Sequence, residues 1–182
     1  NLYVGSNGAF NLLVVSNGAL VANGSGFIGA GVSSSNNLAV VTGGGSAWTN
    51  GGPFHVGNSG AGNRLVVSNG GLVQCSSGAL GLNSSSSNNE ATITGAESLW
   101  TIGGNSFSLG LNGAGNRLVV SNGGRMHNGQ ALVGGGPNNE VLVTGAGSSW
   151  TNLTTLIMGL VLGGNRLTVS NGAVVYAAFD VQ

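Results

Sequence analysis

Short apolar segments alternate with runs of Gly, Asn and Ser along the whole chain. One stretch shows the pattern: RLVVS (64–68), LVQCS (72–76) and ALGL (79–82) are separated by only a few polar or glycine residues. Each segment is too short for a helix, and the Gly and Asn residues around it are typical of turns. The pattern therefore predicts three short strands in succession, with no helix between them.

The three-strand unit repeats at a nearly constant spacing. Each unit can be anchored on an Asn that precedes an apolar alternation, and consecutive anchors are 26, 26, 26, 27, 23 and 26 residues apart. The anchors are Asn11, Asn37, Asn63, Asn89, Asn116, Asn139 and Asn165. Units that contain VSNG alternate with units that contain VTG or TITG, so the true repeat is a pair of units.

A period of about 26 residues, with three strands and no tight hairpin, is typical of a parallel β-helix in which each unit forms one coil. We therefore expect a single all-β domain over residues 1–182, a β-solenoid of about seven coils that start near the seven anchors. Coils stacked about 4.8 Å apart would give a rod roughly 34 Å long. Because the chain begins within a repeat, we expect it to be a segment of a longer repeat protein.

Residues at the same place in successive coils should stack into columns. The positions two and four after each anchor are apolar in every unit and should face the core, so the position directly after the anchor should face outward. That outward column reads Leu12, Leu38, Arg64, Glu90, Arg117, Glu140 and Arg166. Each Arg would lie beside a Glu of an adjacent coil. Exposed ion pairs contribute about 0.2 to 1 kcal/mol each, so this structural charge ladder should mainly fix the register of the coils.

Two further outward columns carry small, β-branched and hydroxyl side chains. They are Val14, Val40, Val66, Thr92, Val119, Leu142 and Thr168, and Ser16, Thr42, Ser68, Thr94, Ser121, Thr144 and Ser170. A flat array of methyl and hydroxyl groups is typical of an ice-binding solenoid, which makes ice binding a minor alternative function. Strand propensity alone favours the same residues, and only Thr92 with Thr94 gives a TxT spacing.

All three tryptophans fall eleven residues after an anchor. The column reads Ala22, Trp48, Gln74, Trp100, His127, Trp150 and Tyr176, and the column before it is mostly apolar. We therefore expect the tryptophans to face outward or to lie at a corner of the coil. The indole rings either shield apolar surface of the adjacent turn or form a platform for the sugar rings of an extracellular glycan. The candidate glycan-binding residues are Trp48, Trp100, Trp150 and Tyr176.

Composition narrows the class of partner. Charged residues make up only 4% of the chain and 37 residues are Gly, yet 41% of the residues are hydrophobic and regularly spaced, which excludes a disordered linker. A formal net charge of zero argues against a nucleic-acid partner and against a peripheral membrane protein. No apolar run reaches 18 residues, so we expect no membrane insertion.

The sequence offers no arrangement of side chains suited to catalysis. Glu90 and Glu140 are separated by a coil that carries Arg117, which fits a charge ladder and not a pair of catalytic carboxylates. The two histidines fall in different columns and form no metal site with Cys75, the lone cysteine. We therefore expect no enzyme activity, no cofactor and no metal.

The phrases VTGAGSSWTN (143–152), FHVGNSGAGNRLVVSNGG (54–71) and LNSSSSNNEATITG (82–95) resemble repeats in the passenger regions of bacterial autotransporters and related β-helical surface proteins. The resemblance covers nearly the whole chain. It implies a right-handed parallel β-helix that is secreted or displayed at the cell surface, with a role in adhesion, surface coating or matrix formation. The last stretch, VVYAAFDVQ (174–182), departs from the repeat and should cap the rod or begin a different region.

The expected function is therefore that of an extracellular structural or adhesive segment. Stacked coils leave unpaired strand edges at both ends of a solenoid, which favours end-to-end or lateral association with other copies into filaments or a matrix. A polysaccharide-binding module is the alternative from a different class, and it depends on the exposure of the Trp column.

Overall fold

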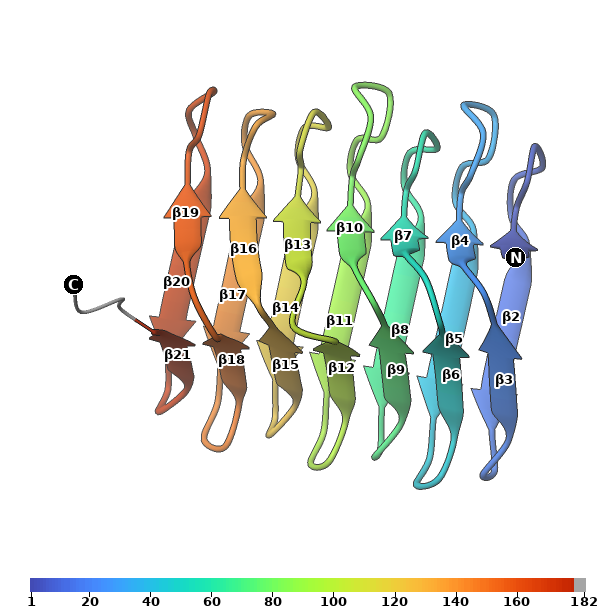
Figure 1. Cartoon of the computed structure of the whole chain (residues 1–182), viewed down its shortest axis with the longest axis horizontal. Coiled ribbons are helices and arrows are strands. Elements are labelled where there is room, and N and C mark those ends of the chain that lie inside the picture. Colours follow the sequence, from blue (N-terminus) through green and yellow to red (C-terminus); the bar gives the residue numbers. More distant parts are fainter. Residues whose placement is uncertain (179–182) are drawn as a thin grey trace.

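The chain folds into a straight rod of stacked coils (Figure 1). The computed structural model describes residues 1–178, and all regular secondary structure in that part of the chain is strand. Three seven-stranded parallel sheets run along the rod, and neighbouring strands in each sheet are three strands apart in the chain. Each coil thus contributes one strand to every sheet, which confirms the parallel all-β solenoid of about seven three-strand coils.

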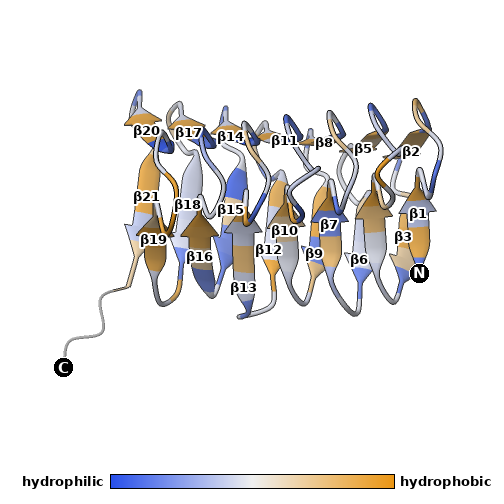
Figure 2. Cartoon of the chain, turned by 90° about the horizontal axis from the view of Figure 1, so that it is seen from above, coloured by the Kyte–Doolittle hydropathy of each residue, from blue (hydrophilic) through white to orange (hydrophobic). Residues whose placement is uncertain are grey.

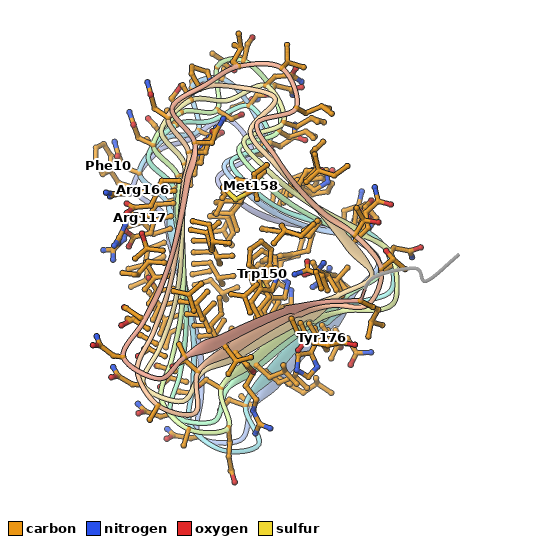
Figure 3. The ribbon with its side chains drawn as sticks, turned by 90° about the vertical axis from the view of Figure 1, so that its left-hand side faces the viewer. Phe10, Arg117, Trp150, Met158, Arg166 and Tyr176 are labelled. Atoms are coloured by element: carbon orange, nitrogen blue, oxygen red, sulfur yellow. The ribbon has the colours of Figure 1, made fainter. Side chains whose placement is uncertain are left out.

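The three sheets form the three sides of a roughly triangular cross-section (Figure 3). Sheet A contains β1 (Leu2–Val4), β4 (Gly26–Ile28), β7 (Phe54–Val56), β10 (Gly78–Leu80), β13 (Ser106–Leu109), β16 (Gln130–Val133) and β19 (Leu156–Met158). Sheet B contains β2 (Leu12–Ser16), β5 (Leu38–Thr42), β8 (Arg64–Ser68), β11 (Glu90–Thr94), β14 (Arg117–Ser121), β17 (Glu140–Thr144) and β20 (Arg166–Ser170). Sheet C contains β3 (Leu20–Asn23), β6 (Ala47–Asn50), β9 (Leu72–Cys75), β12 (Leu99–Ile102), β15 (Arg125–Asn128), β18 (Ser149–Asn152) and β21 (Val174–Ala177).

Coil 1 holds β1 to β3, and each further coil holds the next three strands, up to β19 to β21 in coil 7. The last of these, β21, pairs in parallel with β18. The start of the C-terminal stretch therefore still follows the repeat. Residues 179–182, for which a cap or a new region was expected, lie outside the described residues.

The anchor asparagines stack into a ladder at the corner that leads from sheet A into sheet B. The backbone N–H and the side-chain Nδ2 of Asn37 both donate to Oδ1 of Asn63 in the next coil, at 3.0 and 2.9 Å. Both side chains are fully buried, so these bonds satisfy amides that water does not reach. Beside the ladder, Gly29 has a φ of 76°, and a Cβ there would come within 2.1 Å of Asn63 Nδ2. Only glycine fits where the backbone passes so close to the amide.

The core alternates between two kinds of coil. In the even coils sheet C places a Trp inward while sheet B places a smaller residue, as Trp48 and Ala39 show in coil 2. In the odd coils sheet B places a Leu inward and sheet C places no Trp, as Leu65 and Val73 show in coil 3. At this position sheet B thus contributes Ala or Val to a layer that holds a Trp and Leu to a layer that holds none, since a core tolerates neither voids nor overlap. This packing explains why the sequence repeats in pairs of units.

Candidate functional site

The charged column expected from the sequence is a continuous ladder of ion pairs on the outer face of sheet B. Its members, which are Cα partners in successive strands, are Arg64, Glu90, Arg117, Glu140 and Arg166. Glu90 accepts hydrogen bonds from Arg64 at 3.1 Å and from Arg117 at 3.3 Å. Glu140 accepts from Arg117 Nε at 3.0 Å and from Arg166. Figure 3 shows Arg117 and Arg166 on this outer face. Each Glu of the ladder is thus held by two Arg.

The ladder is partly open to solvent. The side chain of Arg166 is 69% exposed and that of Glu140 is 26% exposed. Partial burial would raise the pKa of the Glu140 carboxyl, but hydrogen bonds from Arg166 and Arg117 outweigh it and hold the pKa below its usual value. Because water screens such pairs, each contributes about 0.2 to 1 kcal/mol. The main effect is on register, since a slip of one coil would place Arg on Arg and Glu on Glu.

The tryptophans do not face outward, and that expectation is wrong. Trp48, Trp100 and Trp150 are each 0% exposed, and Figure 3 shows Trp150 inside the cross-section. Trp48 is the Cα partner of Val21 and Val73. Both valines belong to the apolar column that was expected to lie one residue before the Trp column. A fully buried ring cannot stack on a sugar, so the tryptophans form no glycan platform.

The error comes from a turn of variable length between sheets B and C. The turn has four residues in the coils that carry Trp, as at 43–46, and three residues in the other coils, as at 69–71. A fixed count of eleven residues from the anchor therefore mixes inward with outward positions. Tyr176 does face outward and is 55% exposed, but its partner in the column is Thr151, so it extends no aromatic platform.

The indole rings instead belong to an aromatic column inside the rod. Rings contact one another edge to face, at centroid distances of 4.8, 5.8, 5.4 and 6.4 Å, in the order Trp48, Phe54, Trp100, Phe107 and Trp150. Such contacts add about 0.5 to 1.5 kcal/mol each beyond the burial of the rings. The tryptophans thus tie sheet C to sheet A across the core.

The hydroxyl column on sheet B is engaged within the protein. Ser68 Oγ donates to Thr42 Oγ1 at 2.9 Å, and Ser121 Oγ donates to Thr94 Oγ1 at 3.0 Å. Asn69 Nδ2 adds a third hydrogen bond, to Thr42 Oγ1, at 3.2 Å. The hydroxyl groups therefore stabilise the stack of coils.

A short aromatic row, not expected from the sequence, lies on the outer face of sheet A. Tyr3 stacks on Phe27 at 5.1 Å with an interplanar angle of 12°, and Phe27 meets His55 edge to face at 5.3 Å. The stacking covers one face of the Tyr3 ring, which is 46% exposed. Burial lowers the pKa of His55, and a hydrogen bond with Asn58 opposes this effect. The only sequence signal is an aromatic ring at the centre of β1, β4 and β7, the sheet A strands of coils 1 to 3.

A second polar ladder, also missed from the sequence, lies at the corner after sheet C. In coils 5 and 6, Asn128 Nδ2 donates to Asn152 Oδ1 at 2.7 Å, and Asn128 Oδ1 accepts from Trp150 Nε1 at 2.7 Å. Asn23 and Asn50 form the same pair in coils 1 and 2 and bind the indole of that layer in the same way. The corner asparagines therefore satisfy the indole N–H groups of Trp48 and Trp150.

This corner ladder is interrupted in the middle of the rod. Cys75 and Ile102 occupy the corner positions in coils 3 and 4 and are Cα partners. Among the described residues, Trp100 Nε1 is the one buried side-chain nitrogen or oxygen with no hydrogen-bond partner. Burial raises the pKa of the Cys75 thiol to about 11. A weak hydrogen bond between the Trp100 side chain and the sulfur has a smaller effect in the opposite direction. The thiol is thus a neutral part of the core at ordinary pH.

Most of the large apolar side chains that are exposed to solvent lie in the first and last coils. Apart from Val32, the exposed ones lie between residues 3 and 20 or between residues 153 and 176. They are Tyr3, Phe10, Leu12, Val14, Leu20, Leu153, Ile157, Leu160, Val161, Leu162, Val169, Val174 and Tyr176. Figure 2 shows hydrophobic strands at both ends of the rod. A hollow of about 420 Å³ opens at the N-terminal end, lined by residues 2–8 and 11–13.

Neither a metal site, nor a membrane-spanning helix, nor a known relative points to a function for the described residues. Within residues 1–178, no three His, Cys, Asp or Glu side chains gather where they could hold a metal ion. No helix in that same stretch is long and apolar enough to cross a membrane. Comparison with protein families, with curated proteins and with solved structures finds no match for this chain. The candidate function therefore rests on the stack of coils and its ladders.

Proposed function

We propose that the chain is a structural segment of an extracellular β-solenoid, a rod that builds or coats a cell surface and takes part in adhesion there. The observation that carries the proposal is the continuity of bonding along the rod. Three parallel sheets and the anchor Asn ladder pass from coil 1 to coil 7, and the ion pairs continue from coil 3 to coil 7. A stack bonded along all three sides transmits load along its axis, which suits a structural role.

The resemblance of the repeats to autotransporter passenger regions supports an extracellular location. The surface is compatible with that setting. Five of the chain's eight charged residues form the ladder, in which each Glu is paired with two Arg: Arg64, Glu90, Arg117, Glu140 and Arg166. The turns are built mostly from Gly, Asn and Ser, so the outside of the rod is polar but nearly uncharged.

Location is the first test of this proposal. Antibodies raised against the purified chain would be applied to intact cells that produce the protein, and to the same cells after permeabilisation, with a cytosolic protein as the control. We expect equal labelling before and after permeabilisation, and loss of the signal when intact cells are treated with protease. Labelling that appears only after permeabilisation would overturn the extracellular assignment.

A further inference from the structure

Two turns between sheets B and C, in coils 3 and 5, contain Asn followed by Gly, the dipeptide most prone to spontaneous deamidation in proteins. We propose that Asn69 and Asn122 are latent sites of this reaction, held unreactive by hydroxyl groups of the coils on either side. The reaction needs only water. The inference therefore goes beyond the proposed structural role and does not depend on it.

The reaction begins at the backbone nitrogen of the residue after the Asn. This nitrogen gives its proton to hydroxide and attacks the side-chain carbon Cγ. A new C–N bond forms, the bond from Cγ to the side-chain nitrogen breaks, and ammonia leaves with a proton from water. Water then opens the five-membered succinimide ring at either of its carbonyl groups, which gives aspartate or isoaspartate. Ring closure therefore requires a free backbone N–H and a side-chain amide that can turn towards it.

The two turns require the labile dipeptide and leave it at the surface. The φ angles are 52° at both Asn and 82° and 83° at the following Gly70 and Gly123. Two successive residues with positive φ favour Asn followed by Gly, because these residues adopt the left-handed region most easily. Both Asn are exposed to solvent, and the Gly after each is partly exposed. Protection against deamidation therefore has to come from hydrogen bonds.

The backbone N–H that would attack is bonded to the coil that follows. Gly70 N–H donates to Ser98 Oγ, and Gly123 N–H donates to Ser148 Oγ, both at 3.0 Å. Both serines are buried. Ser98 Oγ gives its own proton to the Thr94 carbonyl at 2.8 Å, and Ser148 makes the same bond within its turn, so each serine oxygen is left as an acceptor for the Gly. A nitrogen that keeps its proton in such a bond cannot attack Cγ.

The side-chain amide of each Asn is bonded to the coil that precedes it. Asn69 Nδ2 donates to Thr42 Oγ1 at 3.2 Å, and Asn122 Nδ2 donates to Thr94 Oγ1 at 3.1 Å. The amide has to leave its Thr before Cγ can face the backbone nitrogen. Both groups that must move are therefore held, one by each neighbouring coil. The even coils supply the Ser and the Thr, and the odd coils supply the Asn and the Gly.

Deamidation at these turns would disturb the strand that follows. Isoaspartate carries the main chain through its side-chain carbon, which lengthens the backbone by one atom. The turn at 69–71 has only three residues, and its length decides which side chains of β9 face inward. Chains with isoaspartate at either turn should therefore melt at a lower temperature than unmodified chains. The hydroxyl groups thus protect the packing of sheet C.

The first experiment compares the native chain with the same chain unfolded in urea, during incubation at mildly alkaline pH. Peptide mapping follows each site separately, and isoaspartate in the product identifies the succinimide route. We expect both sites to react at least about tenfold more slowly in the native chain, because two hydrogen bonds must break before the ring can close. Equal rates in the two states, or a product that contains only aspartate, would overturn the proposal.

The second experiment separates the hydroxyl groups from general protection by the fold. S98A removes the acceptor of the Gly70 N–H, and S148A removes that of the Gly123 N–H. We expect S98A to raise the rate about two- to tenfold at Asn69 alone, and S148A to do the same at Asn122 alone. Each variant is thus the control for the other. Equal acceleration at both sites within one variant, or acceleration at neither, would contradict the assignment.

The bond to the side-chain amide is tested in the same crossed design. T42V and T94V keep a branched side chain of similar size but remove the acceptor of one Asn each. T42V should speed the reaction at Asn69 alone, and T94V at Asn122 alone. Circular dichroism at the incubation temperature verifies that every variant is folded, since an unfolded chain would react at both sites. Unchanged rates in both Thr variants would show that the amide bonds do not protect these turns.

Discussion

The corner after sheet C exists in two versions within one rod. In coils 5 and 6 it contains the polar pair Asn128 and Asn152, which also binds an indole N–H. In coils 3 and 4 it contains the apolar pair Cys75 and Ile102, and the indole N–H of Trp100 has no partner. The backbone register is the same at both corners. Two different side-chain solutions therefore support one coil geometry.

The difference shows that the two partners of a buried polar pair can be replaced together, whereas replacing only one of them lowers stability. Replacing both partners of a buried hydrogen bond by apolar groups is close to neutral, whereas removing one partner leaves a buried group that has lost its water. The Cys75 and Ile102 corner follows this rule for the pair itself. It departs from the rule at Trp100, whose N–H has no partner of good geometry and faces only the weakly accepting sulfur of Cys75.

The largest effect should come from breaking the complete corner. The variant N128C copies the residue found at Cys75 but leaves both Asn152 and the Trp150 N–H without their partner. We expect the free energy of unfolding to fall by about 2 to 5 kcal/mol, since two buried groups lose their hydrogen bonds. Urea unfolding measures this. N23C is the control, because Asn23 lies half-buried in an end coil, and an equal loss there would contradict the explanation.

Next, Trp→Phe substitutions compare the two indoles directly. W100F and W150F remove similar volume from the same column, but W100F also removes an unsatisfied N–H, whereas W150F leaves Asn128 Oδ1 without its donor. We therefore expect W150F to lower the free energy of unfolding by about 1 to 3 kcal/mol more than W100F does. Equal losses in urea unfolding would mean that Trp100 Nε1 is satisfied in solution.

A smaller effect should come from rebuilding the interrupted corner as a polar pair. C75N alone offers an acceptor to Trp100 but buries an amide against Ile102, and I102N alone buries an amide against the thiol. In the double variant the two amides can bond as Asn128 and Asn152 do. We expect a favourable coupling of about 1 to 3 kcal/mol in the double-mutant cycle. Additive effects would show that the corner cannot accept the polar pair.

The smallest effect should come from the exposed charge ladder, the solvated counterpart of the buried corner. Because Arg166 and Arg117 lower the pKa of Glu140 in the folded state, its contribution is present above the unfolded pKa near 4.5 and is lost as pH falls through the lower folded value. E140Q should cost about 1 kcal/mol or less at pH 7, and less still at acid pH. A cost that is independent of pH would show that Glu140 acts through packing.

The sequence alone predicts the features that depend on fixed spacing from the anchor Asn. The inward columns of sheet B, the hydroxyl column and the order of charges from Arg64 to Arg166 all lie within a few residues of an anchor, where no turn intervenes. The position of the tryptophans could not be predicted in this way, because it lies beyond a turn of three or four residues. Each extra turn residue shifts the sequence along the following strand by one position. Side chains that were expected to point inward then point outward, and the reverse.

The corner asparagines were missed for the same reason. Asn23 and Asn50 align only after the longer turn of the even coils is taken into account.

The close passage of glycine beside the anchor ladder has a practical consequence for engineering. In each coil a glycine equivalent to Gly29 is followed by a loop that ends at the anchor Asn. The loop has as few as four residues, at 135–138, and as many as seven, at 30–36. The sheet B strands that follow these loops keep their pairing. The geometry of the coils thus does not depend on the length of this loop. Foreign peptides grafted at this edge, one per coil, would form a row of epitopes at molecular spacing on a scaffold that does not need to be redesigned.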